Sequence, residues 1–474
     1  MLFQSLKFIL FLIIIFLVYW KLPHKWRWGW LMAAGYFFYS MLNLKYFFLL
    51  LLITCVAFQV AKMIERAAVP KRKICLISYI VLVLGILCSY KYLNFFADIV
   101  KNVIGFMGVQ MKSRILEIAL PVGISFYLFQ TLGYVIDVYN GKIKAEKHFG
   151  YFATSVAFFP ILLSGPIERI QNLTEQLKKK KEFVYEEGCA AVEQIMIGYF
   201  KKLIIADSLF VLVNKIYANL YEYQGFIFLI AIICFSVQIY CDFSGYSDIA
   251  IGVARLFGIH VRQNFRQPYF ADSIRDFWRR WHISLSSWFR DYVYIPLGGK
   301  RVSEWKRSRN LLITFLLSGL WHGAGWTFLV WGGLHGALQI LENFWMTLKE
   351  KYFGTVNIPK ALRQFCVFVL ISIAWIFFRA NTLSDGWFVL VHSFDGILNL
   401  KDYLQLGISA IGMPVVQMGM LLSFMVILFW LDVREEKGRR IKLYGIKLVV
   451  LSELALFYYL RYGIDSSTFI YFQF

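Results

Sequence analysis

Apolar residues in this chain gather in long runs that short polar and basic stretches separate. Runs of this length without charges are typical of helices that cross a lipid bilayer. The clearest of them occupy residues 2–20, 30–61, 74–96, 226–240, 365–378, 406–431 and 443–460. The pattern therefore predicts a polytopic membrane protein built from α-helices, because a helix satisfies its own backbone hydrogen bonds in hydrocarbon.

Composition supports this all-α fold class. Of the 474 residues 59% are hydrophobic and only 17% are charged, and mean hydropathy is +0.59. At about 20 residues per span, we expect roughly 11 to 13 membrane segments, including re-entrant or interfacial helices. We expect one integral-membrane domain over residues 1–474, with N-terminal spans in 1–112, a core in 113–345 and C-terminal spans in 346–474.

The net charge of +21 has a membrane explanation, because the cations bunch in short loops between apolar runs. Such loops indicate the cytoplasmic side, beside an anionic leaflet. Candidates are residues 62–73, 178–181 together with Lys201 and Lys202, and 300–309. A nucleic-acid partner is not expected, since no binding motif accompanies the charge. The seven cysteines form neither a disulfide framework nor a metal site, and no resident metal is expected.

The first apolar run is expected to remain as a span. Residues 8–18 resemble a signal-peptide core, but no small-residue cleavage site follows them, and residues 20–26 form a basic and aromatic interfacial anchor. Residues 115–138 contain Pro121, Gly123 and Asp137, which indicate a broken or buried segment. In residues 158–169 two prolines and a glycine end or bend a helix, and we expect Glu168 to form a structural pair with Arg169.

A second polar group lies at residues 241–248, directly after a strongly apolar run. We expect a polar turn or re-entrant loop in which Asp242 and Asp248 are neutralised by arginines such as Arg255, Arg262 or Arg266. Direct chemistry by these carboxylates is the alternative.

Residues 265–299 are the least membrane-like of the periodic stretches. Aromatic and leucine positions recur at helical spacing, which predicts an amphipathic helix at an interface or entering a cavity. On such a helix Arg279, His282 and Ser286 share a face. A solvated or interfacial histidine is the alternative reading of His282.

His322 stands near the middle of the apolar stretch 316–336, between Trp321 and Trp326. Ionisable residues at membrane depth are rare and usually mark a functional site, so His322 is our candidate chemical centre. The alternative is a histidine that merely bridges two helices. His335 follows thirteen residues later, about 20 Å away on a continuous helix, and is expected to pack or line a polar surface.

Several of these stretches, taken together and in order, resemble one family. They are residues 132–139 (LGYVIDVY), 158–166 (FFPILLSGP), 238–248 (QIYCDFSGYSD), 264–270 (NFRQPYF), 277–291 (FWRRWHISLSSWFRD), 296–299 (PLGG), 320–324 (LWHGA), 374–380 (AWIFFRA) and 471–474 (YFQF). The chain is similar in them to the membrane-bound O-acyltransferases, specifically the bacterial branch that contains the alginate O-acetylases.

The resemblance implies acyl transfer across a membrane to a hydroxyl of an extracytoplasmic polymer. It implies His322 as the catalytic residue, and it aligns His282 with a second family position occupied by His or Asn. Relatives arrange their helices as a ring around a thinned central funnel. Many work with a separate periplasmic or extracellular acyltransferase of the SGNH type, and we expect such a partner here besides membrane lipid.

The chemistry is reasonable on its own terms. An imidazole with an ordinary pKa near 6.5 can take the proton of a sugar hydroxyl as the oxygen attacks a thioester. We expect acetyl-CoA or another acyl thioester as donor substrate, with no permanently bound cofactor. His282 with Arg279 would orient the donor or polarise its carbonyl. An acyl-histidine intermediate and direct transfer both remain open. Further residues expected to line the substrate or donor site are Trp321, Asp242, Ser244 and Asn264.

The expected function is O-acetylation of an alginate-like exopolysaccharide or a cell-wall glycan, in the bacterial cytoplasmic membrane. A D-alanyl transferase for teichoic acid is the nearest alternative. From other classes, a polysaccharide-export component would line a conduit with polar residues, although paired half-repeats are not evident. A structural scaffold would use His322 only to hold a partner.

Overall fold

The computed structural model describes residues 3–106, 120–354, 358–438 and 446–462, and every regular element in these ranges is a helix. The predicted segments at 471–474 and the start of the run at 115–138 lie outside the described residues. The chain forms two compact units, one from Met1–Val192 with Ile249–Arg262 and the other from Glu193–Asp248 with Gln263–Phe474. The predicted single membrane domain, its internal boundaries and its central funnel stay predictions.

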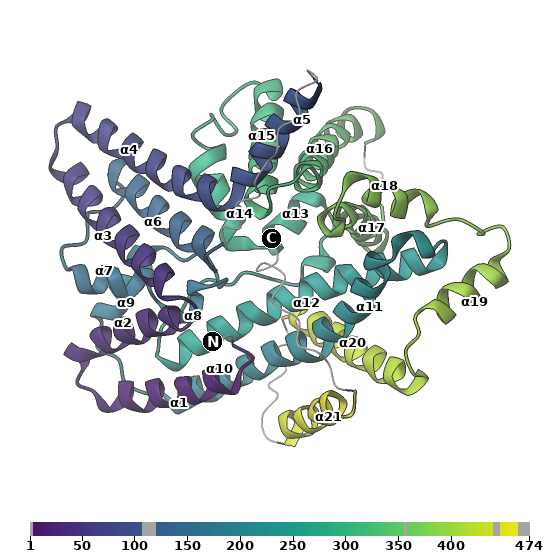
Figure 1. Ribbon diagram of the computed structural model, residues 1–474, viewed down its shortest axis with the longest axis horizontal. Helices are drawn as coiled ribbons and strands as arrows, with labels where there is room; N and C mark the ends of the chain where they lie inside the picture. The colour runs from purple at the N-terminus through teal and green to yellow at the C-terminus, as the bar shows by residue number, and fades with distance from the viewer. Residues whose placement is uncertain (1–2, 107–119, 355–357, 439–445, 463–474) are drawn as a thin grey trace. The chain divides into compact units, whose positions relative to one another are not determined.

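The first unit holds the N-terminal helices (Figure 1). They are α1 (Leu6–Lys21), α2 (His24–Ser40), α3 (Leu44–Arg66), α4 (Val69–Leu87), η1 (Cys88–Tyr92), α5 (Leu93–Phe106), α6 (Ile124–Tyr139), α7 (Phe149–Val156), α8 (Phe159–Leu162) and α9 (Ile170–Lys178). Two further helices, α10 (Tyr185–Tyr199) and α12 (Phe226–Leu256), contribute residues to both units.

The second unit holds the remaining helices. They are η2 (Phe200–Ala206), α11 (Asp207–Ala218), η3 (Leu220–Glu222), η4 (Pro268–Phe270), α13 (Ile274–Arg280), α14 (Ile283–Phe289), η5 (Arg290–Tyr294), α15 (Glu304–His322), α16 (Trp326–Leu348), η6 (Lys349–Phe353), α17 (Lys360–Arg379), α18 (Leu383–His392), α19 (Leu400–Ala410), α20 (Val415–Glu436) and α21 (Ile446–Tyr462).

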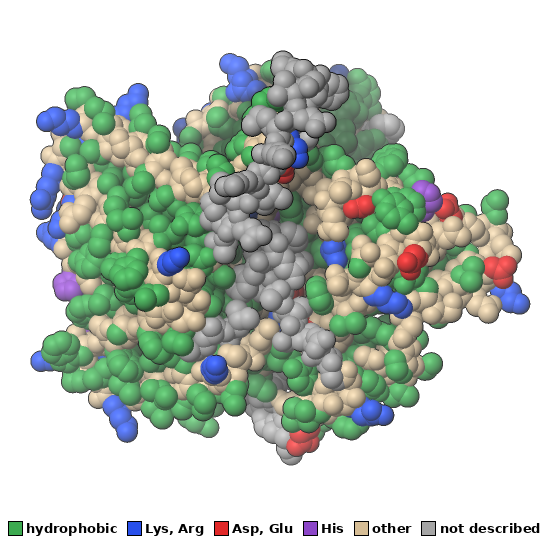
Figure 2. Space-filling model, in the orientation of Figure 1, with side chains coloured by type: hydrophobic (Ala, Val, Ile, Leu, Met, Phe, Trp, Pro, Cys, Tyr) green, Lys and Arg blue, Asp and Glu red, His purple; other side chains and the backbone are tan. Residues whose placement is uncertain are grey.

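Among the described residues, five helical segments are long and apolar enough to cross a membrane. They are Leu44–Arg66, Val69–Lys101, Phe226–Leu256, Lys360–Arg379 and Val415–Glu436. Leucine, isoleucine and phenylalanine side chains stay exposed on many helices, and Figure 2 shows apolar side chains over much of the face in view. Such a surface suits hydrocarbon and not water. The chain is therefore an all-α, multi-pass membrane protein, and the total of 11 to 13 segments stays a prediction.

Local signals divide two of the predicted apolar runs. The run at 30–61 contains the end of α2 and the start of α3, where the Asn43 side chain accepts a hydrogen bond from Lys45 N at 2.9 Å and caps α3. The run at 406–431 is interrupted at Gly412, whose φ is +67°, and Pro414 is the N-cap residue directly before α20. Each of these runs therefore holds parts of two helices, and the single span predicted over 406–431 is wrong.

Buried aromatic rings hold the first unit together. Phe8 contacts Phe38 at 6.0 Å between ring centroids, and Phe11 contacts Phe159 at 5.2 Å, so α1, α2 and α8 share a core. The predicted structural role of Glu168 agrees with its burial, since its carboxylate accepts from Arg169 N at 2.8 Å. The structure adds Arg262 as a partner, with Nε 3.3 Å from the Glu168 carboxylate.

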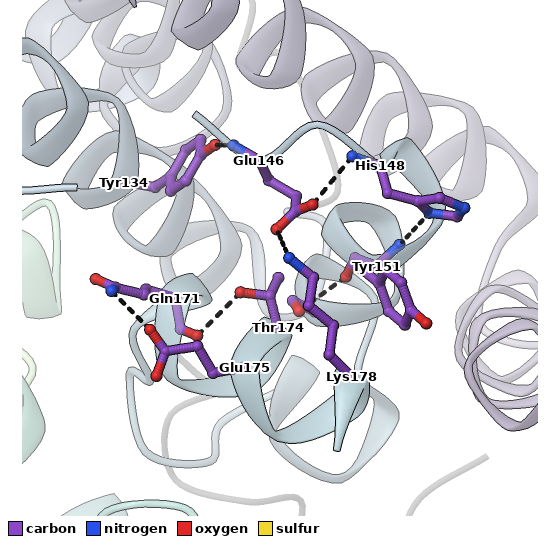
Figure 3. Close-up of polar contacts among 9 residues, drawn as sticks. Tyr134, Glu146, His148, Tyr151, Gln171, Thr174, Glu175 and Lys178 are labelled. Carbon is purple, nitrogen blue, oxygen red and sulfur yellow. Dashed lines mark hydrogen bonds and ion pairs between the residues drawn. The ribbon is translucent and has the colours of Figure 1, made fainter. Parts of the chain in front are cut away.

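Polar contacts around Glu146 fix the connection between α6 and α7 in the same unit (Figure 3). Its carboxylate accepts from His148 N at 3.0 Å and pairs with Lys178 at 2.5 Å. Its backbone N–H donates to the hydroxyl of Tyr134 at 2.7 Å. Lys178, the first residue of the predicted basic loop at 178–181, is thus the last residue of α9 and part of this polar network.

Candidate functional site

α15 and α16 form a helical hairpin that positions His322. Glycines lie where the two backbones approach: a Cβ added to Gly319 would meet Phe328 O at 2.2 Å, and one added to Gly332 would meet Phe315 O at 2.4 Å. The hairpin corrects two expectations. His322 is the last residue of α15, not the middle of a continuous helix, and residues 304–309 of the predicted basic loop form the start of α15.

Gly332→Ala should therefore destabilise the hairpin, because its methyl group would collide with backbone that cannot move without separating the helices. We expect a loss of about 1–3 kcal/mol or more in the free energy of unfolding, measured as a lower Tm in detergent. Gly333→Ala is the matched control, since its Cβ would lie 3.7 Å from a Leu316 side-chain atom. Equal Tm values for the two variants would contradict the close packing.

The His322 ring is 3% exposed and lies among aromatic rings. Its centroid is 4.9 Å from that of Trp321, 4.9 Å from that of Trp331 and 5.3 Å from that of Phe378. These rings come from α15, α16 and α17. Three helices thus hold the imidazole in one orientation in a setting of low polarity, where a hydrogen bond to a substrate would be strong.

His282 lies in the connection between α13 and α14, outside the five candidate spans. Its φ is +42°, a left-handed conformation that His and Asn adopt more readily than most residues. The helix predicted over 265–299 is therefore wrong: it is broken at this point into α13 and α14. Arg279, His282 and Ser286 do not share one helix face, and the Arg279 side chain is exposed.

Asn264 organises the loop that carries His282. Its side-chain Oδ1 lies 3.2 Å from His282 Nδ1 and accepts from Ser284 N at 3.2 Å, while its backbone oxygen accepts from Ile283 N at 2.9 Å. His282 and Asn264 are both fully buried. The amide thus caps the start of α14 and holds the imidazole that precedes it.

Trp321 connects the two predicted catalytic histidines. Its ring centroid lies 5.9 Å from that of His282 and 4.9 Å from that of His322. Phe243 of α12 closes another side of His282 at 4.6 Å between centroids. Residues from 243 to 322 therefore meet at one buried site in the second unit, which includes four of the predicted positions: Asn264, His282, Trp321 and His322.

His335 lies much nearer to His322 than a continuous helix would allow. The turn at residues 323–325 reverses the chain, so both histidines contact the Trp331 ring, His335 at 4.8 Å and His322 at 4.9 Å between centroids. The predicted separation of about 20 Å rested on a continuous helix and is wrong. Phe277, Trp278 and Trp375 also surround His335, which fits the predicted packing role.

Neither ring nitrogen of His335 has a hydrogen-bond partner among the described residues. A buried polar group without a hydrogen bond costs about 1–3 kcal/mol in the free energy of unfolding. His335→Phe should therefore keep or raise stability, because the phenyl ring fills the same space among the surrounding aromatic rings. Thermal unfolding of the purified variant in detergent measures this. A clearly lower Tm would contradict the expectation and would indicate that the imidazole has a buried water partner.

The carboxylates at 241–248 are engaged by lysines. Lys202 Nζ lies 2.6 Å from Asp242 and 2.8 Å from Asp207, and all three side chains are buried. Lys201 Nζ lies 2.8 Å from Asp248. The predicted polar turn is wrong, because α12 runs unbroken through these residues. Lys201 and Lys202 belong to η2 and are buried, so their assignment to a cytoplasmic loop is wrong as well.

The other predicted lining residues differ in their surroundings. Ser244 is buried on α12, and its hydroxyl has no hydrogen-bond partner among the described residues. Asp242 is held by Lys202, so its carboxylate is not free for a substrate.

Sequence reasoning missed Arg280, which pairs with Asp276 at 2.7 Å and with Glu436 at 2.6 Å. The acidic residue four positions before Arg280 was a signal for the first of these pairs.

No group of three or more His, Cys, Asp or Glu side chains in the described part of the chain could hold a metal ion. The arrangement instead offers two buried imidazoles beside one indole. Such rings can accept and return a proton, and their aromatic walls exclude water.

Comparison with known proteins agrees with this arrangement. Residues 147–379 match the membrane-bound O-acyltransferase family, a range that contains all the predicted site residues. The chain is 37% identical over 395 residues to the probable alginate O-acetylase of Azotobacter vinelandii, covering 82% of this chain and 77% of that protein.

Two further relatives bear names of related activities. The peptidoglycan O-acetyltransferase of Helicobacter pylori is 34% identical over 392 residues, covering 76% of this chain and 72% of that protein. The teichoic acid D-alanyltransferase of Bacillus subtilis is 30% identical over 249 residues, covering 49% of this chain and 61% of that protein. The chain belongs to the membrane-bound O-acyltransferase family and is a multi-pass membrane O-acyltransferase.

Proposed function

We propose that this enzyme moves an acetyl group from a cytoplasmic thioester to a hydroxyl of an extracytoplasmic polysaccharide. The observation that carries the proposal is the pair His282 and His322, two buried imidazoles whose rings both lie against the ring of Trp321. The names of the relatives from A. vinelandii and H. pylori support acetyl as the group and a polysaccharide as the acceptor.

In the proposed reaction His322 acts as general base. It takes the proton of the acceptor hydroxyl while the hydroxyl oxygen forms a bond to the thioester carbonyl carbon. The tetrahedral intermediate collapses as the carbon–sulfur bond breaks, and the proton passes from the imidazolium to the departing thiolate. The products are an ester and a free thiol, and no oxidant, reductant or metal is needed.

The donor in this proposal is acetyl-CoA or another acyl thioester that arrives as a substrate. The site lies in the bacterial cytoplasmic membrane, and the acetyl group leaves the chain toward the extracytoplasmic side. An SGNH-type acyltransferase there is the proposed partner, which binds the polymer and presents its hydroxyl to this site. The basic residues at 62–73, predicted as a loop, lie at the end of α3 and in the first turns of α4, and their charge supports a cytoplasmic location for these helix ends.

The test is a comparison of envelope polysaccharides from a wild-type strain, a strain lacking the gene and a complemented strain. The proposal expects acetyl esters to disappear on deletion and to return on complementation, while the amount of exported polymer is unchanged. Loss of alanyl esters instead would identify a D-alanyl transferase. Loss of the polymer itself, with normal esters on what remains, would indicate an export component.

A further inference from the structure

The four contacts of the Asn264 side chain determine which of its two terminal atoms is the oxygen. One terminal atom faces the backbone N–H of Ser284 at 3.2 Å and the Ser284 hydroxyl at 2.7 Å, and the other faces the Ser247 hydroxyl at 3.4 Å. A backbone N–H can only donate a hydrogen bond. The atom beside Ser284 must therefore be the amide oxygen, and the nitrogen points toward Ser247.

This orientation fixes the role of the nearer ring nitrogen of His282. His282 Nδ1 lies 3.2 Å from the same amide oxygen. Because a carbonyl-type oxygen only accepts, Nδ1 must carry the hydrogen and donate it. The ring is neutral, since complete burial lowers the pKa of His282 to about 3. A neutral imidazole has one N–H, so Nε2 carries a lone pair.

We propose that Asn264 is a positioning residue that holds His282 in the Nδ1–H tautomer, so that Nε2 accepts a hydrogen bond from a second hydroxyl of the acceptor sugar and orients the hydroxyl whose proton His322 takes. This role deepens the proposed function and rests on it for the identity of the substrate group. It replaces the expectation that His282 polarises the thioester carbonyl, because that task needs an N–H donor at Nε2.

Packing explains why the amide can hold this tautomer. Asn264 is fixed at both ends, by Ser247 of α12 and by the first turn of α14, and its backbone oxygen binds Ile283 N. Phe243 and Trp321 close on the His282 ring from two sides. Rotation of the imidazole by half a turn would bring a ring carbon to the amide oxygen and lose the hydrogen bond.

The direct test reads the tautomer of the resting protein. Histidine nitrogens labelled with ¹⁵N distinguish protonated from unprotonated ring atoms in a magnetic resonance spectrum of the purified protein. The His282 signals are assigned by their loss in His282→Gln. The proposal expects a protonated Nδ1 and an unprotonated Nε2 in the wild type. A protonated Nε2 would overturn it, whatever reaction the enzyme catalyses.

Variants of Asn264 test whether that residue is the cause. Asn264→Asp keeps an acceptor beside Nδ1 and should retain the tautomer, whereas Asn264→Leu has a similar volume but no acceptor and should lose it. Ser284→Ala is the matched control, since it removes another hydrogen bond to the same oxygen without touching Nδ1. A folded Asn264→Leu protein with an unchanged tautomer would overturn the role of Asn264. If that variant does not fold, the wild-type spectrum decides.

Kinetics separate positioning from a merely structural role. With radiolabelled acetyl-CoA and membranes that contain the polysaccharide, Asn264→Leu should lower kcat by roughly 10²-fold, the range for a misplaced substrate, with little change in KM. Asn264→Asp should recover most of kcat. A rise in KM alone would contradict the proposal. Absence of acetyl transfer by the wild type would refute the proposed function, while the tautomer result would stand.

Discussion

His322→Phe should abolish acyl transfer while leaving the protein folded. The phenyl ring keeps the contacts that the imidazole makes with Trp321, Trp331 and Phe378, but it has no nitrogen to take a proton. Loss of a positioned general base typically lowers a rate by about 10²–10⁴-fold. The transfer rate from a radiolabelled thioester in membrane vesicles measures the effect, with the amount of folded protein checked by size-exclusion chromatography.

His335→Phe provides the matched control. It makes the same substitution in the same hairpin, against the same Trp331 ring, at an imidazole that we assign to packing. We expect it to retain most of the transfer rate. An equal loss of transfer rate in both variants would show that the hairpin tolerates neither substitution. If both variants kept the wild-type rate, His322 would have no part in the reaction.

Lys202→Met should prevent stable folding. Lys202 lies between Asp207 and Asp242, and the side chains of all three are at most 3% exposed. Removing the ammonium group of Lys202 leaves the two buried carboxylates without the positive charge that neutralises them. Breaking a buried ion pair in this way costs about 3–5 kcal/mol, a large share of the 5–15 kcal/mol that typically separates a folded protein from its unfolded state. Yield and Tm in detergent report the loss.

Two further variants make this result specific. Lys180→Met removes a cation from an exposed pair, Lys180 with Glu182, at 3.7 Å, and should change Tm little. The triple variant Lys202→Met, Asp207→Asn and Asp242→Asn removes the whole charged group and should recover much of the stability. A Lys202→Met protein as stable as the wild type would contradict the ion-pair geometry.

The sequence was most informative where one residue's environment depends on its neighbours in the chain. Runs such as 74–96 and 365–378 lie within helices, because a long apolar segment in lipid has no other way to satisfy its backbone. The break at Gly412 and Pro414 also has a local signal in the sequence, because glycine and proline often end helices. The many apolar residues on both sides nevertheless lead to the prediction of one span there. The histidine in an apolar segment and the family motifs around it indicate the candidate site from the sequence.

Pairings between distant segments could not be predicted in the same way. Lys202 reads as part of a basic stretch, and only the packing of η2 against α12 places it between two carboxylates. Gly245 of α12 permits that approach, since a Cβ there would meet the backbone nitrogen of Lys202 at 3.1 Å and Gly198 O of α10 at 2.7 Å. The left-handed turn at His282 likewise depends on Asn264, eighteen residues earlier in the chain. Periodicity alone predicted one helix there, and tertiary contacts broke it.

The most direct test of the central claim is mass analysis of envelope polysaccharides from strains that express the wild type, His322→Phe or His335→Phe at equal levels. The account predicts acetyl esters in the wild-type and His335→Phe strains and none above the deletion background in the His322→Phe strain, with equal polymer in all three. Normal acetylation in the His322→Phe strain would contradict it.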